Sequence, residues 1–381
     1  MKIPNTIEDF NQVFFIGVAG TGMSALAQYL SGVGKMVSGS DRYFSEGKAL
    51  DIKEKLEQAK ITCFGQDGTG IHEHIELIVV STAIEDSVPE VQKAKTLGIP
   101  IIHRSALLSL IAKSKRTIAV AGTSGKSTTS AMLFDILQAA NLQPSIISGA
   151  GLVSIIEQGK IGNAYVGAGE WLIIEADESD GSITQYQPEV GLLLNVDKDH
   201  QEMEELIRLF EIFKSNTQSL FVTNQSHEIS GSLSVDMKQD FSTDNHPAGY
   251  TASQFVQNGM HIQFSINGTP FSLNTIGKHN MENAVAAVAA AAQLGVGLDI
   301  CVKALTNYKG IYRRSQFLGS FKGIHLIDDY AHNPVKCAAS IRSCQDIASK
   351  VIAWFQPHGY GPTRFLKDDF IKEFSESLRP T

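Results

Sequence analysis

A glycine-bearing loop lies between an apolar run and a helical run in the stretch AVAGTSGKSTTSAMLFDIL, and this feature constrains the fold most. The pattern predicts a strand that ends at Ala121 and a helix that opens with Lys126 and Ser127. Backbone N–H groups of such a loop, together with the positive end of the helix dipole, cradle phosphate groups. The lysine neutralises the outer phosphates and the serine hydroxyl coordinates Mg²⁺. The candidate phosphate-binding residues are Gly122, Thr123, Ser124, Gly125, Lys126, Ser127 and Thr128.

Two further apolar runs end in acidic residues. WLIIEADESDGS predicts a buried strand that delivers Glu175, Asp177 and Glu178, and NVDKDHQE follows another strand with Asp199 and His200. Ligands of open α/β sheets bind outside the carboxyl ends of the strands, where a carboxylate suits a hydrated Mg²⁺. Alone, EADESDGS would equally fit a solvated acidic turn, but its place beside a phosphate loop favours the metal.

The N-terminal turn forms a second glycine pattern. It reads GVAGTGMSALA from Gly17, and Asp41 follows about twenty residues after the turn, as in a dinucleotide fingerprint. One such match is a weak signal, and it leaves a hydride-transfer enzyme open as an interpretation. Two phosphate-binding turns in one chain favour an enzyme that joins ATP chemistry to a second nucleotide-linked substrate.

Strands alternate with helices along most of the 381 residues, which predicts an α/β fold with parallel sheets. We expect a domain over 1–115, a second over 116–309 and a third over 310–381. Within the second, the shorter alternating runs of 224–275 predict a small antiparallel patch. The run VIAWFQPHG predicts a further strand in the third domain, which looks cut short because about 70 residues are too few for a full nucleotide fold.

Composition narrows the class of protein. The net charge of −8 argues against a general nucleic-acid binder, and four scattered cysteines fit a reducing compartment. The acidic N-terminus does not resemble a secretion signal, and the alanine-rich run 284–294 is too short to span a membrane. We therefore expect a cytoplasmic enzyme with no nucleic-acid partner and no membrane insertion.

The motifs in this order resemble the Mur ligases, the ATP-dependent amide ligases of peptidoglycan-precursor synthesis, over essentially the whole chain. The resemblance rests on GVAGTGMSALA, SGSD, AGTSGKSTT, EADESDGS, DKDH, GKHNMENA, YRRSQ, DDYAHNP and FQPH. The family's phosphate loop has the form GTxGK[ST], which explains why Val120 replaces an early glycine. The resemblance implies a Rossmann-like N-terminal domain, a P-loop central ATPase domain and a partial Rossmann-like C-terminal domain.

The resemblance also implies a role for each matching residue. The UDP part of a UDP-sugar would lie on Gly20, Thr21, Gly22, Met23 and Asp41. In the central domain, Lys126 would bind the ATP phosphates, Ser127 and Glu175 one Mg²⁺, and His200 a second. Asn280 and Asn283, expected as exposed amides one helical turn apart, would meet the adenine.

The third domain would complete the site, because Arg314 and Asp329 match nucleotide contacts and His332 matches a residue that faces the incoming amino acid. The implied substrates are UDP-N-acetylmuramate, ATP and an amino acid, with L-alanine favoured. The sugar's carboxylate would attack the γ-phosphate of ATP, and the amino group would then displace phosphate from the acyl phosphate.

One stretch departs from the family pattern. FQPHRYxRTR of the family is FQPHGYGPTR here, so that Gly359 and Pro362 replace two arginines and only Arg364 remains. Glycine and proline cannot supply a guanidinium fork for a carboxylate. Another amino acid or a peptide therefore stays open as the acceptor, as does a nucleotide-binding protein without ligase turnover. Lys214 lies in the region where several family members carry a carbamylated lysine, but its register leaves that role unassigned.

Overall fold

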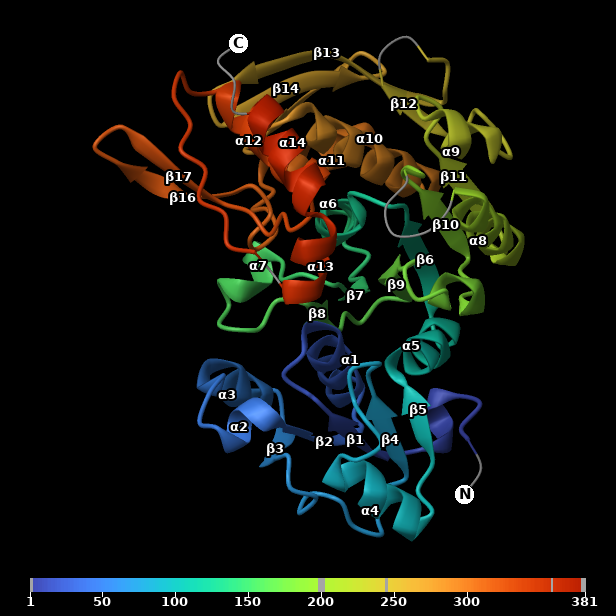
Figure 1. Ribbon diagram of the computed structural model, residues 1–381. Coiled ribbons are helices and arrows are strands. Elements are labelled where there is room, and N and C mark those ends of the chain that lie inside the picture. Colours follow the sequence, from blue (N-terminus) through green and yellow to red (C-terminus); the bar gives the residue numbers. More distant parts are fainter. Residues whose placement is uncertain (1–2, 198–202, 244–245, 358, 378–381) are drawn as a thin grey trace.

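The computed structural model describes residues 3–197, 203–243, 246–357 and 359–377, and it is built around two largely parallel sheets (Figure 1). The sheet of the N-terminal part lies below the sheet of the middle part in Figure 1, and the C-terminal part lies at the top left. Across the described ranges, no helix combines the length and the apolar character that a membrane span requires.

The N-terminal part contains a five-stranded sheet and its helices. In chain order the elements are η1 (Ile7–Asp9), β1 (Gln12–Ile16), α1 (Thr21–Gly32), β2 (Met36–Asp41), α2 (Arg42–Ser45), α3 (Leu50–Gln58), β3 (Ile61–Gly65), β4 (Leu77–Val80), α4 (Pro89–Leu97), β5 (Ile101–His103) and α5 (Arg104–Lys113). All neighbours are parallel, in the order β3-β2-β1-β4-β5. Both faces of β1 are buried, because Val13 and Phe15 pack into one core while Phe14 and Ile16 pack into another. The order reverses between β1 and β4, the usual place for a ligand in a doubly wound sheet.

The second sheet has six strands, and its elements are β6 (Arg116–Ala121), α6 (Lys126–Ala139), β7 (Ser145–Ile147), α7 (Val153–Ile156), β8 (Ala164–Tyr165), β9 (Trp171–Ala176), η2 (Ser182–Gln185), β10 (Val190–Leu193), α8 (Met203–Asn216), β11 (Leu220–Thr223) and α9 (Glu228–Ser232). The order is β11-β10-β6-β9-β7-β8, and only β8 runs antiparallel to its neighbour. The strands predicted in TIAVAG, WLIIEAD and VGLLLNVD are β6, β9 and β10, so these predictions are confirmed. Ala121 pairs with Ala176 on one side and Leu193 on the other, so the loops that follow the three strands begin at one edge.

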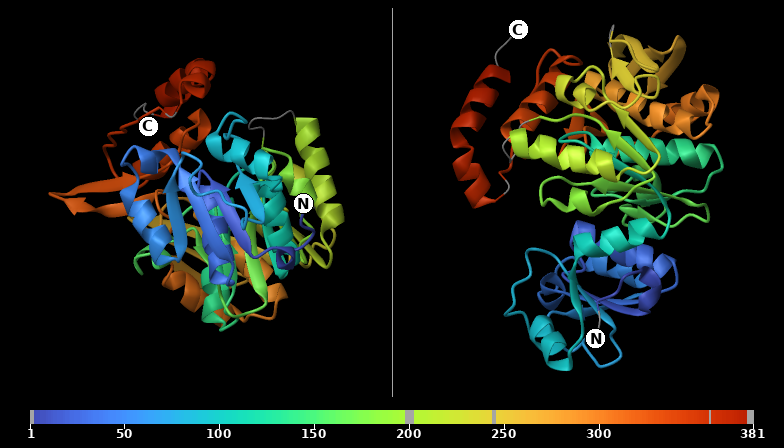
Figure 2. Two further views of the ribbon diagram at one scale, coloured as in Figure 1. Left: turned by 90° about the horizontal axis from the view of Figure 1, so that it is seen from below. Right: turned by 90° about the vertical axis from the view of Figure 1, so that its right-hand side faces the viewer.

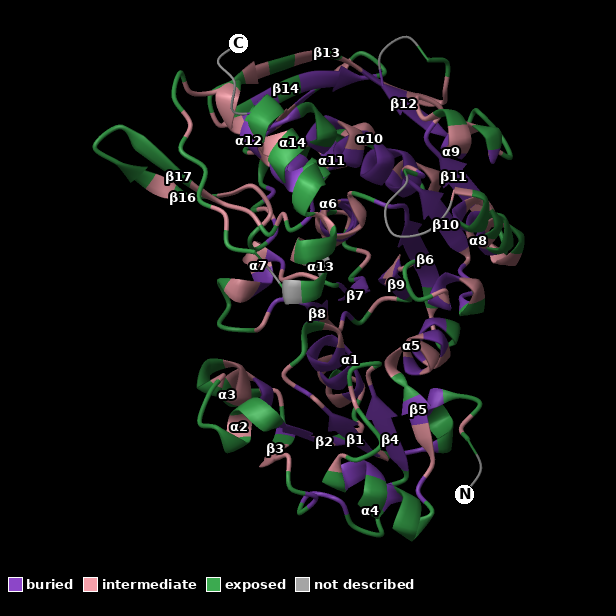
Figure 3. Ribbon diagram, in the orientation of Figure 1, coloured by how far each residue is buried: buried purple, intermediate pink, exposed green. Residues whose placement is uncertain are grey.

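A third sheet has four strands, which are β12 (Phe241–Thr243), β13 (Tyr250–Asn258), β14 (His261–Ile266) and β15 (Thr269–Leu273). Two helices follow it, α10 (Lys278–Gln293) and α11 (Leu298–Thr306). The predicted antiparallel patch is confirmed for β13, β14 and β15, whereas β12 runs parallel to β13. Helix α10 packs against both this sheet and α6, and Ala284 to Ala291 are fully buried (Figure 3). Small side chains suit a helix that is surrounded on all sides.

The C-terminal part contains β16 (Gln316–Phe321), β17 (Ile324–Asp328), α12 (Pro334–Gln345), α13 (Tyr360–Phe365) and α14 (Lys367–Ser377). Here the structure differs from the expected partial Rossmann-like unit, because β16 and β17 form an antiparallel hairpin and 351–357 is not a strand. An extended run becomes a strand only when a neighbour satisfies its backbone N–H and C=O groups. No strand of the described residues pairs with 351–357, and Trp354 is 94% exposed.

Helix α1 joins the first sheet to the second (Figures 1 and 2). The buried Asn163 amide donates hydrogen bonds to the carbonyl of Thr21 and to the Ser24 hydroxyl, at 2.7 and 2.9 Å. The Gln28 amide in turn donates to the Asn163 carbonyl oxygen at 2.8 Å. The N-terminus of α1 is thereby fixed against the middle part of the chain.

Candidate active site

The loop between β6 and α6 has a backbone conformation that only glycine adopts without strain. Gly122 and Gly125 have φ angles of +132° and +85°. A Cβ atom on Gly125 would clash with the side-chain oxygen of Asn283, and one on Gly122 would press on the backbone of Asn195 at 3.1 Å. Because α6 begins at Lys126, its unpaired N–H groups face this loop. The geometry is that of a phosphate cradle.

Lys126 is held by carboxylates that follow β9. Its ammonium lies 2.7 Å from the Glu178 carboxylate and 3.7 Å from that of Asp177, and it donates to the Gly122 carbonyl at 2.8 Å. Burial of the ammonium opposes its charge, but Glu178 and Asp177 outweigh this, so the pKa of Lys126 is raised. The lysine is therefore a fixed positive charge at the mouth of the loop.

Ser127 and Glu175 form an oxygen pair beside the loop. The Ser127 hydroxyl donates to Glu175 Oε2 at 2.9 Å, while Ser148 Oγ and the Gly149 N–H donate to Oε1, each at 2.7 Å. A hydroxyl and an oriented carboxylate are ligands that Mg²⁺ accepts, with waters and substrate phosphates completing the shell. The pair therefore fits Mg²⁺, although the described part of the chain holds no cluster of three or more His, Cys, Asp or Glu suited to a metal. His200, the expected ligand of a second Mg²⁺, lies outside the described residues.

Asn195 is a loop-holding residue that sequence reasoning missed. Its side-chain oxygen accepts hydrogen bonds from Thr123 Oγ1 at 2.9 Å and from the Ser124 N–H at 2.8 Å, and its amide donates to the Ser124 carbonyl. Its position just after β10, at the edge where the loop begins, is the signal that could have identified it. Beside it, Asp197 receives a hydrogen bond from His227 at 3.0 Å, and this bond lowers the pKa of Asp197.

The two asparagines of α10 are buried, not exposed as expected. Asn280 and Asn283 are 5% and 8% exposed. The Asn280 amide donates to Thr275 Oγ1 and the Ile276 carbonyl, and Asn283 accepts a hydrogen bond from Thr129 in α6. The expectation failed because α10 is enclosed between α6 and the third sheet. Both residues nevertheless line the same cleft as the phosphate loop.

A cleft of about 640 Å³ gathers most of the candidate residues. From the C-terminal part, Arg314, Asp329 and His332 also line it. Asp329 accepts hydrogen bonds from the Ser315 and Ala331 N–H groups, both at 2.7 Å, which fixes its carboxylate. Of the residues expected to contact ATP and Mg²⁺, the cleft contains Thr123, Ser124, Gly125, Lys126, Ser127, Thr128, Glu175, Asn280, Asn283, Arg314 and Asp329.

The N-terminal turn lies outside this cleft. Gly20 caps α1, and Thr21, Gly22 and Met23 form the first turn of that helix. Asp41 is 6% exposed, and its carboxylate accepts hydrogen bonds from the Ala19 and Tyr43 N–H groups, both at 3.0 Å. Asp41 thus holds the turn in place, at the reversal point of the first sheet.

Arg104, which the sequence reasoning also missed, lies between the turn and the cleft. It opens α5. Its guanidinium nitrogen lies 3.1 Å from where a Cβ on Gly22 would be, and it forms an ion pair with Asp180 at 3.5 Å. Asp180 belongs to the EADESD stretch that also supplies Glu175 and Glu178. No motif pattern singles out this arginine, because its contacts join elements that are distant in sequence.

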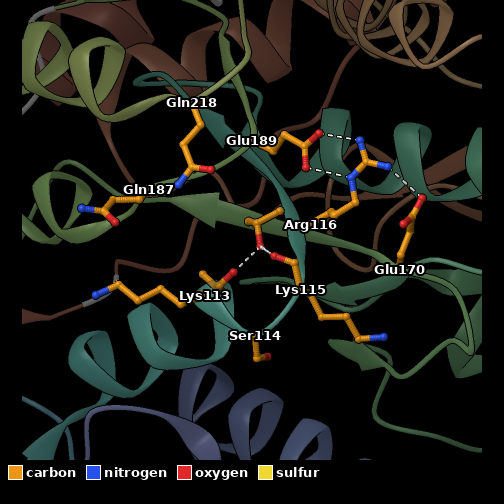
Figure 4. Close-up of a pocket in the computed structure, with 10 residues that line it drawn as sticks. Lys113, Ser114, Lys115, Arg116, Glu170, Gln187, Glu189 and Gln218 are labelled. Atoms are coloured by element: carbon orange, nitrogen blue, oxygen red, sulfur yellow. Dashed lines mark hydrogen bonds and ion pairs between the residues drawn. The ribbon is translucent and has the colours of Figure 1, made fainter.

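A second pocket, of about 560 Å³, lies at the opposite end of β6 (Figure 4). There Arg116 forms hydrogen-bonded ion pairs with Glu189 through two nitrogens and with Glu170 at 2.9 Å, and its guanidinium stacks over Trp171. These contacts tie neighbouring strands together.

The described residues that line the first cleft, of about 640 Å³, do not include Gly359, Arg364 or Lys214.

The chain is similar to known proteins over most of its length. Residues 12–116 match the Mur ligase family, catalytic domain, and residues 120–291 match the Mur ligase middle domain. The UDP-N-acetylmuramate–L-alanine ligase of Gloeothece citriformis is 33% identical, over 97% of this chain and 83% of its own length. That of Carboxydothermus hydrogenoformans is 35% identical, over 96% of this chain and 79% of its own length.

Solved structures give the same result. The crystal structure of UDP-N-acetylmuramate-alanine ligase from Thermotoga maritima superposes with a TM-score of 0.81 at 26% identity, over 95% of this chain and 83% of that one. A murein peptide ligase from Psychrobacter arcticus shares the fold, with a TM-score of 0.73 at 23% identity, over 88% of this chain and 76% of that one. With its two matched domains and its relatives above 30% identity, this chain belongs to the Mur ligase family.

Proposed function

We propose that this chain is an ATP-dependent ligase that joins L-alanine to UDP-N-acetylmuramate through an acyl phosphate, with release of ADP and phosphate. Relatives with 33% and 35% identity over nearly the whole chain are named for this reaction. The structural observation that carries the proposal is a single cleft lined by Lys126, by the Ser127–Glu175 pair, and by Arg314 and His332.

The reaction must bring two anions together, because the sugar carboxylate attacks a phosphate that is itself charged. Positive charge and positioning therefore account for most of the catalysis. Lys126 would bind the transferred phosphate from the loop side of the cleft, and Arg314 would contact the nucleotide from the other side. The buried Asn280 and Asn283 would lie next to the adenine.

The Ser127 hydroxyl and the Glu175 carboxylate would hold Mg²⁺, and His200 would hold a second ion. When bound, these ions would neutralise phosphate charge. Ser148 and Gly149 keep the Glu175 carboxylate turned toward Ser127, so this part of the site is oriented in advance.

The UDP part of the sugar substrate would lie on Gly20, Thr21, Gly22 and Met23, in the turn that Asp41 holds. The lactyl carboxylate would reach the cleft past Arg104. His332 would face the incoming amino acid, whose amino group attacks the acyl carbon while phosphate leaves. We propose the cytoplasm, where ATP is available, as the place of this reaction.

We also propose that the work is divided along the chain. Residues 1–115 would bind the UDP-sugar, 116–309 would bind ATP, and 310–381 would bind the amino acid. The separate sheets at 12–103 and 116–223, together with the family matches at 12–116 and 120–291, support the first boundary.

Phosphate release from ATP and Mg²⁺ tests the proposal when UDP-N-acetylmuramate and a panel of amino acids and peptides are added in turn. We expect release that requires both the UDP-sugar and L-alanine. Release that requires another amino acid or a peptide would keep the ligase chemistry but replace the acceptor. No release under any pairing, with ATP still bound, would favour a nucleotide-binding protein.

A further inference from the structure

Glu175, near the end of β9, and Glu178, just after that strand, serve different partners, although they are only three residues apart. Glu175 is oriented toward Ser127, whereas Glu178 is paired with Lys126 at 2.7 Å. The Glu178 side chain is 8% exposed and that of Lys126 is 16% exposed, so this ion pair is largely shielded from water. The proposed roles of Ser127, Glu175 and Lys126 leave Glu178 without a function.

A buried carboxylate next to a phosphate site has an electrostatic consequence. The triphosphate must approach Lys126, and in doing so it brings negative charge close to Glu178 and to Asp177. Repulsion between like charges is strong where water is largely excluded. A divalent cation on the phosphates cancels much of this repulsion, whereas the metal-free nucleotide experiences all of it.

We propose that Glu178 is a positioning residue that holds Lys126 in the phosphate loop and makes this loop select metal-bound ATP over metal-free ATP. The proposal rests on the ATP-binding role of the cleft. Before the nucleotide binds, Glu178 fixes the ammonium beside the Gly122 carbonyl. When the nucleotide binds, the same carboxylate disfavours phosphates that lack a cation.

The test measures binding of a non-hydrolysable ATP analogue by calorimetry, with Mg²⁺ and with EDTA, and it requires no turnover. The selectivity is the ratio of the two dissociation constants. In Glu178→Gln, which removes the charge and keeps the shape, we expect this ratio to fall about tenfold. Glu178→Asp, which keeps the charge, should retain most of the selectivity of the unaltered chain.

Glu170→Gln is the matched control, because Glu170 also pairs with a cation, Arg116 (Figure 4). It lies just before β9, whereas Glu178 lies just after that strand. Its selectivity should equal that of the unaltered chain. If Glu178→Gln does not fold, Asp177→Asn provides the test, since Asp177 is more exposed and lies 3.7 Å from Lys126. There the ratio should fall about twofold to threefold.

An unchanged ratio of the two dissociation constants in Glu178→Gln would overturn the proposal. If Glu178→Gln does not fold, an unchanged ratio in Asp177→Asn would overturn it. Failure of the unaltered chain to bind the analogue under either condition would instead contradict the ATP-binding role of the cleft. The two failures are therefore distinguishable.

Discussion

At the scale of single residues, Lys126 links the fold to the chemistry, because it opens α6 and is held in the phosphate loop by Glu178 and the Gly122 carbonyl. In the proposed mechanism, Lys126→Ala removes the positive charge that would bind the transferred phosphate. We expect kcat for phosphate release to fall by about 100- to 1000-fold. Binding of UDP-N-acetylmuramate, measured by calorimetry, should remain almost unchanged, because the N-terminal turn lies outside the cleft. Equal loss of both would show that the assignment of two separate sites is wrong.

Asp135 in α6 is a half-buried residue with a consequence for stability. Burial raises the pKa of Asp135 to about 7, from 3.8 in the unfolded chain. A carboxyl whose pKa is higher in the folded state makes the protein less stable as the pH rises from the lower value to the higher one. Asp135→Asn removes this effect. Its free energy of unfolding, relative to the unaltered chain, should increase by about 2 kcal/mol between about pH 5.5 and about pH 8.

Urea unfolding at the two pH values measures this difference. The matched control is Glu211→Gln in α8, where the side chain is exposed. A difference for Asp135→Asn that stays constant across the range would contradict the raised pKa.

At the scale of elements, the turn between β6 and α6 depends on Gly125. Alanine there would combine a positive φ with a clash against Asn283. We expect Gly125→Ala to weaken binding of the ATP analogue at least about tenfold, because the loop must open to accommodate the methyl group. Gly98→Ala is the control, since Gly98 ends α4 with a φ of +66° and has open space around it. It should cost about 1 kcal/mol of stability and leave nucleotide binding intact. Similar nucleotide affinity in both variants would contradict the role of the loop geometry.

The sequence predicted the elements whose pattern is local and continuous. The apolar runs of β6, β9 and β10 and the glycine loop before α6 are such patterns, and the structure confirms these elements. The strand expected at 351–357 was wrong, because strand formation depends on a neighbour that the run itself cannot encode. The exposure of Asn280 and Asn283 was wrong for a similar reason, since α10 is buried between α6 and the third sheet.

The residues that sequence reasoning missed have in common that their function depends on contacts between distant segments. Asn195 holds a loop 71 residues away, and Arg104 connects the N-terminal turn to Asp180. Neither stands in a spacing typical of a site. By contrast, Lys126 and Ser127 could be predicted because their neighbours in sequence are also their neighbours in space.

At the scale of the whole molecule, the contact of α1 with the middle part fixes the N-terminal glycine turn relative to the second sheet. Asn163 carries this contact through its bonds to Thr21, Ser24 and Gln28. Asn163→Ala would leave buried polar groups without partners, so we expect the free energy of unfolding in urea to fall by about 1–3 kcal/mol. As a control, Asn307→Ala removes one exposed hydrogen bond. This substitution should change the free energy of unfolding by less than about 0.5 kcal/mol. Equal effects of the two substitutions would contradict a role of Asn163 in joining the sheets.

The most direct test of the proposed chemistry follows oxygen atoms through one turnover. UDP-N-acetylmuramate labelled with ¹⁸O in its carboxylate is incubated with ATP, Mg²⁺ and L-alanine, and the released phosphate is analysed by mass spectrometry. An acyl phosphate keeps one carboxylate oxygen on the phosphorus when the amine displaces it, so we expect one ¹⁸O atom in the phosphate for each amide formed from fully labelled substrate. Amide formation with unlabelled phosphate would contradict the account.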